Sequence, residues 1–270
     1  SSYNQSINIS NIYSTLIVIK INTVCYNLKM SYKPIPILMY HSIAAMPKGT
    51  VMRSLHVPPK LFRLQMWLLK ILGYKGLSMS DLQPYLIGDK QGKVVGITFD
   101  DGFKNNLAGA LPTLNKFGFS ATCYIISQNI GGINHWDLDK GIPENPLMDK
   151  DEIKQWINGG MEIGSHAQNH VRLAESDIET ATKEIIQSRL DLEKQFNCSI
   201  NHFCYPYGSY NDEIVDITKN AGYSTATTVN RGRAKSDDNL LTLPRVPITH
   251  RTFIHLFLIK ILSKYEDKHG

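Results

Sequence analysis

Short apolar runs alternate with segments of helical periodicity along most of the chain. Runs rich in β-branched and aromatic residues predict strands at 35–40, 93–99, 121–126, 161–165, 202–205, 223–229 and 245–248. Helical segments separate most of these runs. Strands that alternate with helices in this way are typical of parallel strands joined by crossover helices. The pattern therefore predicts an α/β fold, either an open doubly wound sheet or a (β/α) barrel.

Apolar spacing and glycine terminators predict the first helices. One helix is indicated before Gly73 by apolar residues that recur at helical spacing, namely Leu61, Leu64, Leu68, Ile71 and Leu72. A second helix is predicted over 106–117 and ends at Gly118. The predicted helices lie between predicted strands, as a crossover connection requires.

Capping signals predict two further helix starts. Asp149 with Glu152, and Ser176 with Glu179, each have the spacing of a capping box. Near the C-terminus, apolar residues at helical spacing predict an amphipathic helix over 253–262. We expect that helix to pack on the core.

The first residues of the chain differ from the remainder. Residues 1–29 are rich in Asn, Ser, Ile and Tyr, whereas a well-patterned segment begins directly after Met30. We expect Met30 to be the natural start and residues 1–29 to be an extension outside the fold. Residues 30–270 are then expected to form a single catalytic domain.

Composition excludes some classes of protein. The 270 residues include 29 Lys and Arg and 24 Asp and Glu, which gives a net charge of +5 without any basic run interleaved with aromatics. This distribution argues against a nucleic-acid partner. The apolar stretch over 13–24 is interrupted by Lys20 and is too short to cross a bilayer, so no integral membrane span is expected. A cytoplasmic location, and an envelope location if the natural N-terminus is missing, both remain open.

Polar residues that can bind ligands follow one predicted strand after another. Active sites of parallel α/β folds lie at the carboxyl ends of the strands. The residues at these ends are His41, Asp100, Asp101, His166, His170, Tyr207, Arg245 and His250. Chance would scatter such residues, so their repeated position predicts a site.

Two adjacent carboxylates and a histidine pair indicate a metal. Asp100 and Asp101 follow a buried strand directly, where two carboxylates repel each other unless a cation compensates. His166 and His170, four residues apart, add two imidazoles. Two His and one carboxylate are a frequent ligand set for catalytic zinc, which keeps an open position for water. A turn is the alternative interpretation of Asp-Asp-Gly.

These residues together describe hydrolysis of an amide or ester. Asp100 is placed to accept a proton from the attacking water, and His41 to donate one to a leaving nitrogen. The backbone N–H after Pro206 is placed to bind an oxyanion.

At these positions the chain resembles the polysaccharide deacetylases with the NodB homology domain, carbohydrate esterase family four. Thr-Phe-Asp-Asp-Gly at 98–102 resembles the first motif of the family, Ser-His-Ala-Gln-Asn-His at 165–170 the second, and Tyr-Pro-Tyr-Gly at 205–208 the end of the third. The resemblance implies a distorted (β/α)7-type barrel. It also implies removal of an N-acetyl group from an amino sugar, in a polysaccharide or a lipid-linked glycan, with release of acetate.

The resemblance also implies roles for individual residues. Asp101, His166 and His170 would hold a divalent metal, usually zinc. Asp100 would be the general base, and the Tyr207 backbone N–H would stabilise the tetrahedral oxyanion.

The chain departs from the family pattern at two places. Cys204 stands where many members have an Arg that steadies the base, and residues 248–250 match the family's Leu-x-His motif only loosely. In the branch that includes the poly-N-acetylglucosamine deacetylases, the acid comes from a Tyr-His near the start, which residues 37–42 resemble. We therefore predict His41 as the acid, with His250 second, and Arg245 as the partner of Asp100.

Two alternatives stay open from the sequence alone. One is a non-catalytic glycan-binding barrel, and the other is an amidase acting on a small non-sugar amide. The loop over 131–146 is expected to set specificity. The aromatics Tyr40, Trp136, Tyr205 and Tyr210 are interpreted as core residues rather than sugar-stacking ones.

Overall fold

A computed structural model describes residues 34–46 and 49–268. The predicted extension at 1–29 lies outside these residues. Eight parallel strands form one sheet, and seven of them close into a barrel because β1 pairs with both β8 and β3. The barrel strands are β1 (Ile37–Tyr40), β3 (Val94–Phe99), β4 (Thr122–Ile125), β5 (Glu162–Ser165), β6 (His202–Cys204), β7 (Thr225–Arg231) and β8 (Leu243–Pro247). Within the described residues, the short β2 (Lys75–Leu77) pairs only with β3, outside the ring.

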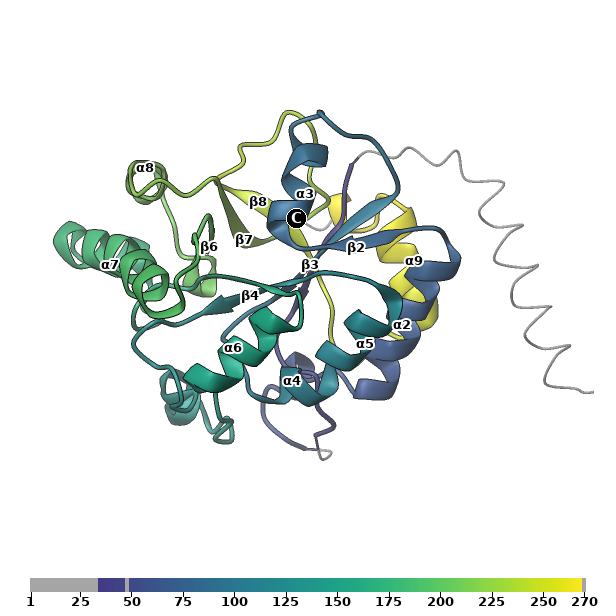
Figure 1. The fold of residues 1–270 in the computed structure, drawn as a ribbon, viewed down its shortest axis with the longest axis horizontal. Helices are drawn as coiled ribbons and strands as arrows, with labels where there is room; N and C mark the ends of the chain where they lie inside the picture. The colour runs from purple at the N-terminus through teal and green to yellow at the C-terminus, as the bar shows by residue number, and fades with distance from the viewer. Residues whose placement is uncertain (1–33, 47–48, 269–270) are drawn as a thin grey trace, which may run out of the picture. The chain divides into compact units, whose positions relative to one another are not determined.

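Helices surround the barrel, as Figure 1 shows. They are α2 (Pro59–Ile71), α3 (Met79–Leu86), α4 (Asn105–Gly109), α5 (Leu111–Phe117), α6 (Lys150–Asn158), α7 (Ile178–Phe196), α8 (Asp212–Asn220) and α9 (Ile254–Leu262). No helix among the described residues is both long and apolar enough to cross a membrane. The predicted (β/α)7-type barrel is confirmed, and the open doubly wound sheet is excluded.

Several details differ from the sequence prediction. The helix predicted over 106–117 is two helices, because Pro112 lacks a backbone N–H and its ring would clash with a preceding carbonyl in a continuous helix. The predicted cap Ser176 is wrong, since Asp177 caps α7 and accepts the Thr180 backbone N–H at 2.8 Å. The capping box of Asp149 and Glu152 is confirmed.

Of the five apolar residues that predicted α2, only Leu68 is buried. Leu64 and Ile71 are 41% and 42% exposed, whereas the buried apolar residues of α2 are Phe62, Met66, Leu68 and Leu69. The helix is apolar on more than one side, so spacing alone did not identify the side that faces the barrel. The opposite side leaves apolar residues in solvent.

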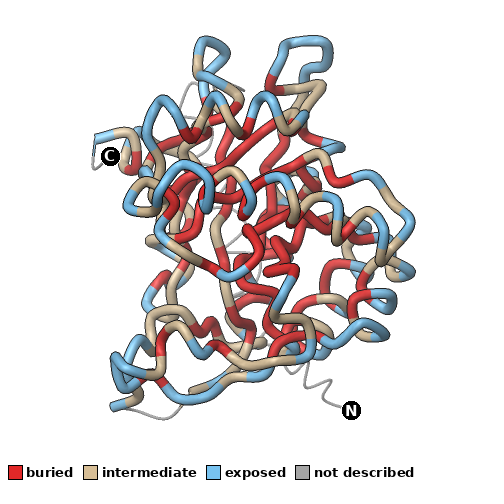
Figure 2. The backbone as a smooth tube through the Cα atoms, turned by 90° about the vertical axis from the view of Figure 1, so that its left-hand side faces the viewer, coloured by how far each residue is buried: buried red, intermediate tan, exposed pale blue. Residues whose placement is uncertain are grey.

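A cluster of aromatic rings fixes the strand ends that carry the site. Tyr40 and Phe99, the last residues of β1 and β3, lie with ring centroids 5.5 Å apart. Phe62 of α2 packs edge-on against Tyr40, and Trp156 of α6 packs edge-on against Phe99. Figure 2 shows the buried backbone in the interior and the exposed segments around it. The packing of the four aromatic rings holds the residues that follow β1 and β3 in place.

A buried histidine beside β1 makes stability depend on pH. His56 is 5% exposed, and its Nδ1 lies 2.7 Å from the Ser42 Oγ. Burial and the nearby His41 lower the pKa of His56 to about 4. The pKa of His56 is lower in the folded than in the unfolded protein, so the neutral imidazole stabilises the fold. This contribution to the free energy of unfolding is complete above about pH 6.5 and is lost as the pH falls toward the folded pKa.

We expect His56→Gln to remove this part of the pH dependence. In the unmodified protein, His56 should lower the free energy of unfolding by about 3 kcal/mol as the pH falls through this window. Urea unfolding of both proteins at a series of pH values measures the difference. If the free energy of unfolding changed with pH in the same way in both proteins, the pKa of His56 would not differ between the folded and unfolded states.

Candidate active site

Three potential metal ligands meet at the carboxyl ends of β3 and β5. Asp101 follows β3, and the Nε2 atoms of His166 and His170 each lie 3.4 Å from its Oδ1. All three residues are buried. Asp101 and His170 have φ values of 70° and 59°, which non-glycine residues adopt rarely and mainly where the surroundings enforce them.

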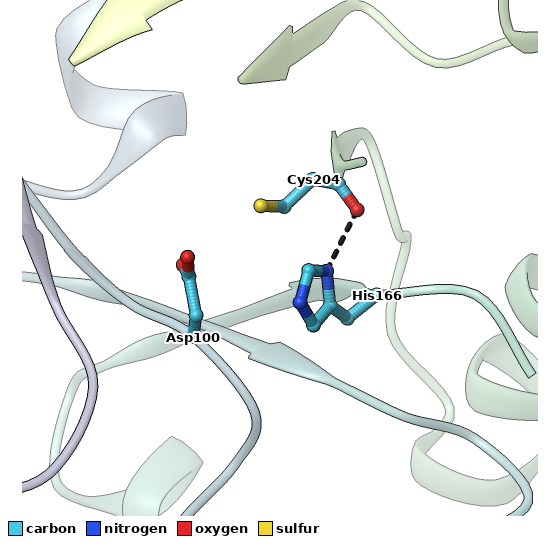
Figure 3. A group of neighbouring side chains, drawn as sticks. All are labelled: Asp100, His166 and Cys204. Atoms are coloured by element: carbon cyan, nitrogen blue, oxygen red, sulfur yellow. Dashed lines mark hydrogen bonds between the residues drawn. The ribbon is translucent and has the colours of Figure 1, made fainter. Parts of the chain in front are cut away.

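The second nitrogen of His166 has a definite partner. Its Nδ1 lies 2.7 Å from the backbone oxygen of Cys204, and Figure 3 shows this bond beside Asp100. Because a carbonyl oxygen only accepts, the Nδ1 carries a proton, and the Nε2 is the nitrogen that faces Asp101. The ring of His170 is held differently, against Trp136 and Tyr207, with centroid distances of 4.5 Å to each.

This arrangement fits a divalent cation. One ligand atom from each of Asp101, His166 and His170 lies within 4.8 Å of the others. Burial alone would raise the pKa of Asp101, but hydrogen bonds from the two histidines outweigh burial and hold it well below its ordinary value. The carboxylate is therefore in its ligand form. Two imidazole nitrogens and one carboxylate oxygen are a donor set that suits zinc.

A buried ion pair holds the second carboxylate. Arg245 Nη1 and Nη2 donate to the two oxygens of Asp100 at 2.7 and 2.8 Å, and Arg245 Nε donates to the Thr228 carbonyl at 2.8 Å. Burial raises the pKa of Asp100, but the charge and hydrogen bonds of Arg245 outweigh burial and lower it. Arg245 Nη2 also lies 3.3 Å from the Cys204 sulfur. The guanidinium of Arg245 is therefore next to Cys204, the position at which the resembled family often has an Arg.

The two candidate acids lie in different places. His41 Nε2 is 3.9 Å from Asp100 Oδ2, and His41 lines the same cavity as Asp100 and Asp101. His250 does not line that cavity, and its backbone N–H donates to the Ser54 carbonyl. The geometry therefore favours His41 over His250.

We expect His41→Gln to lower kcat by about 10²–10⁴-fold, the range for removal of a general acid, and His250→Gln to leave it nearly unchanged. Acetate release at saturating substrate measures both. A larger loss in His250→Gln than in His41→Gln would reverse the assignment.

The cavity lined by the three potential metal ligands has a volume of about 400 Å³. Four residues of the loop over 131–146 line it, namely Trp136, Asp137, Lys140 and Ile142. Trp136 therefore belongs to the site wall, contrary to its interpretation as a core residue. The loop has no periodicity from which these positions were predictable, although it was expected to set specificity because binding residues often lie on loops.

Tyr207 also lines this cavity. Its φ of 57° inside the short turn Pro206–Gly208 is again uncommon for a residue with a side chain. Lys140 Nζ lies 4.8 Å and Arg172 Cζ 4.4 Å from the centre of the Tyr207 ring. These two cations, which sequence reasoning missed, hold the ring and with it the backbone of the turn.

Comparison with known proteins agrees with this geometry. Residues 87–226, just over half of the 270, match the polysaccharide deacetylase family. The chain belongs to this family. As a member of it, the chain is a hydrolase, and the predicted family resemblance is confirmed.

Individual relatives cover most of the chain. It is 31% identical over 217 residues to YxkH of Bacillus subtilis, itself assigned to the polysaccharide deacetylases, covering 80% of this chain and 71% of YxkH. It is 28% identical over 200 residues to a poly-β-1,6-N-acetyl-D-glucosamine N-deacetylase of Staphylococcus aureus, covering 69% of this chain and 66% of that enzyme.

Solved structures extend the comparison to the fold. The deacetylase PplD of Streptococcus pyogenes, in complex with acetate, superposes with a TM-score of 0.73 at 30% identity, covering 84% of this chain and 97% of PplD. IcaB from Ammonifex degensii superposes with a TM-score of 0.70 over 84% of this chain and 97% of IcaB, at 18% identity, which supports the fold alone.

Proposed function

We propose that this protein is a metal-dependent N-deacetylase that removes acetyl groups from amino sugars in a polysaccharide or a lipid-linked glycan. One observation carries the proposal. A carboxylate fixed by a buried arginine, Asp100, lies beside a separate three-ligand set, and both open into one cavity. The N-acetylglucosamine deacetylase among the relatives and the acetate in the PplD complex support the choice of an N-acetyl sugar.

The residues divide the reaction between them. A divalent cation held by Asp101, His166 and His170, zinc in our proposal, would polarise the acetyl carbonyl and acidify a water molecule. Asp100 takes a proton from the attacking water while the water oxygen bonds to the acetyl carbon. The Tyr207 backbone N–H stabilises the oxyanion that forms.

His41 completes the reaction by donating a proton to the nitrogen as the carbon–nitrogen bond breaks. The products are acetate and a free amino sugar. Arg245 contacts none of the reacting atoms in this scheme. It positions Asp100 and keeps it ionised.

We expect Arg245→Lys to lower kcat by about 10–100-fold with little change in KM, because a lysine cannot donate to both oxygens of Asp100 and to the Thr228 carbonyl. Steady-state kinetics of acetate release separate kcat from KM. Unchanged turnover would remove Arg245 from the site.

Acetate release from a substrate panel tests the function. The panel contains N-acetylglucosamine oligomers of several lengths and simple N-acetyl amides, each with active protein and with Asp100→Asn. We expect release from the sugars that depends on Asp100. Release from the simple amides alone would favour an amidase, and no release from any substrate would favour a non-catalytic glycan-binding barrel.

A further inference from the structure

A groove on the outer surface, between α2 and α5, is not part of the active site. It has a volume of about 410 Å³ and is lined by Lys60, Arg63, Leu64, Trp67, Lys116 and Phe117, none of which lines the active-site cavity. We call it the α2–α5 groove. The two helices are neighbours, as Figure 1 shows. Trp67 and Leu64 are 37% and 41% exposed, so large apolar side chains face the solvent here.

The charge around the α2–α5 groove has a single sign. Three of its six lining residues are cations and none is acidic. The sequences of α2 and α5 contain no Asp or Glu. Lys70 adds a fourth cation at the edge, because its Nζ donates to the Phe117 carbonyl at 3.1 Å. The exposed Ile71 continues the apolar surface one turn beyond Trp67.

We propose that the α2–α5 groove docks the protein on the surface of an anionic lipid bilayer. Tryptophan is enriched at the level of lipid headgroups, where one side of the ring is apolar and the other wet. The long stems of Lys and Arg lie along apolar surface while their charges reach the headgroup phosphates. A helix with this combination lies in the plane of the interface without crossing it.

Other occupants fit these side chains less well. A neutral glycan needs acceptors as well as donors for its hydroxyls, and the lining side chains of the α2–α5 groove offer only donors. A soluble acidic polymer would meet the positive charge, but it would leave Leu64 and Ile71 in water. An anionic bilayer satisfies both features, since it presents negative charge and apolar chains together.

Vesicle binding by the 270-residue chain tests the proposal. The probes are vesicles of phosphatidylcholine alone and of phosphatidylcholine with phosphatidylglycerol. We expect binding only to the second, with an affinity that falls as salt rises. Lys60→Gln with Arg63→Gln should lower the partition coefficient about thirtyfold, from the usual contribution of a cation near an anionic surface. The matched control is Lys183→Gln with Lys194→Gln, two exposed lysines on α7 that change the net charge equally.

Tryptophan fluorescence gives a second, local readout. The chain has three tryptophans, of which Trp156 is fully buried and Trp136 lines the active-site cavity. We expect a blue shift on binding to the anionic vesicles that disappears in Trp67→Phe. Unfolding midpoints, and acetate release from a soluble sugar substrate by Lys60→Gln with Arg63→Gln, verify that the variants are folded.

Four results would overturn the proposal. The first is an absence of binding to the anionic vesicles. The second is full binding by Lys60→Gln with Arg63→Gln, which would place the contact in another segment. The third is an equal loss in the α7 control, which would indicate net charge alone. The fourth is binding to a soluble acidic polysaccharide, dependent on Lys60 and Arg63, in a protein that does not bind the vesicles. None of these results depends on whether the barrel is a deacetylase.

Discussion

Asp100→Asn is expected to lower the turnover of an N-acetyl sugar by about 10²–10⁴-fold, because it removes the proposed general base. The substitution preserves the size of the side chain and one acceptor oxygen for Arg245. It leaves Asp101, His166 and His170 untouched, so the metal content should not change. Acetate release and elemental analysis of the same preparation measure the two quantities.

The loss of charge also has a cost in stability that must be separated from catalysis. Arg245 is fully buried, and without the negative charge of Asp100 it should destabilise the fold by about 3–5 kcal/mol. Asp100→Asn combined with Arg245→Met removes both charges, so it should recover part of this stability while staying inactive. Substantial turnover in the folded Asp100→Asn protein would remove Asp100 as the base.

His166→Ala combined with His170→Ala is expected to abolish metal binding and, with it, activity. These changes leave a single carboxylate, Asp101, where a catalytic zinc site needs about three protein ligands. Elemental analysis should find about one equivalent of a divalent metal in the unmodified protein and almost none in the variant. His250→Ala is the matched control, since it removes a histidine that lies outside the cavity.

The metal analysis has a result that would refute the ligand assignment. A full metal load in the double variant would place the ion elsewhere. The second group of nearby ligand atoms in the described residues, from Asp100, His166 and Cys204, also contains His166, so the ion would lie outside both groups.

The fold was predictable because it is encoded locally. Each barrel strand is a short apolar run, and alternation with helices indicates parallel strands. A barrel differs from an open sheet in the pairing of β1 with both β3 and β8. Contacts between segments so far apart in the chain cannot be recognised from the local pattern of apolar and polar residues. The unpredicted β2 and α3 have weak local signals, since β2 is three residues long with Gly76 at its centre and α3 contains Pro84.

The site was predictable to the extent that it sits at strand ends. That rule placed Asp100, Asp101, His166 and His170 together, and the structure brings these four side chains to one cavity. The pairing of Arg245 with Asp100 was predicted from the Cys204 variation, and the structure shows the two side chains bonded to each other.

The walls of the site were not predictable in the same way. Lys140 ends the short 3-10 helix His135–Lys140, and Arg172 follows the second motif. Neither position has a periodic or capping signal in the sequence. They meet at Tyr207 only because the barrel closes. The exposed face of α2 was missed for a related reason, because a helix that is apolar on several sides does not show which side is buried.

In the proposed reaction, a cation held by Asp101, His166 and His170 is needed to release acetate from an amino sugar. The most direct test measures acetate release from an N-acetylglucosamine oligomer by the chelator-treated protein, before and after addition of one equivalent of zinc. We predict that the treated protein is inactive, that zinc restores activity, and that His166→Ala with His170→Ala does not respond. Full activity after removal of all metal would contradict the claim.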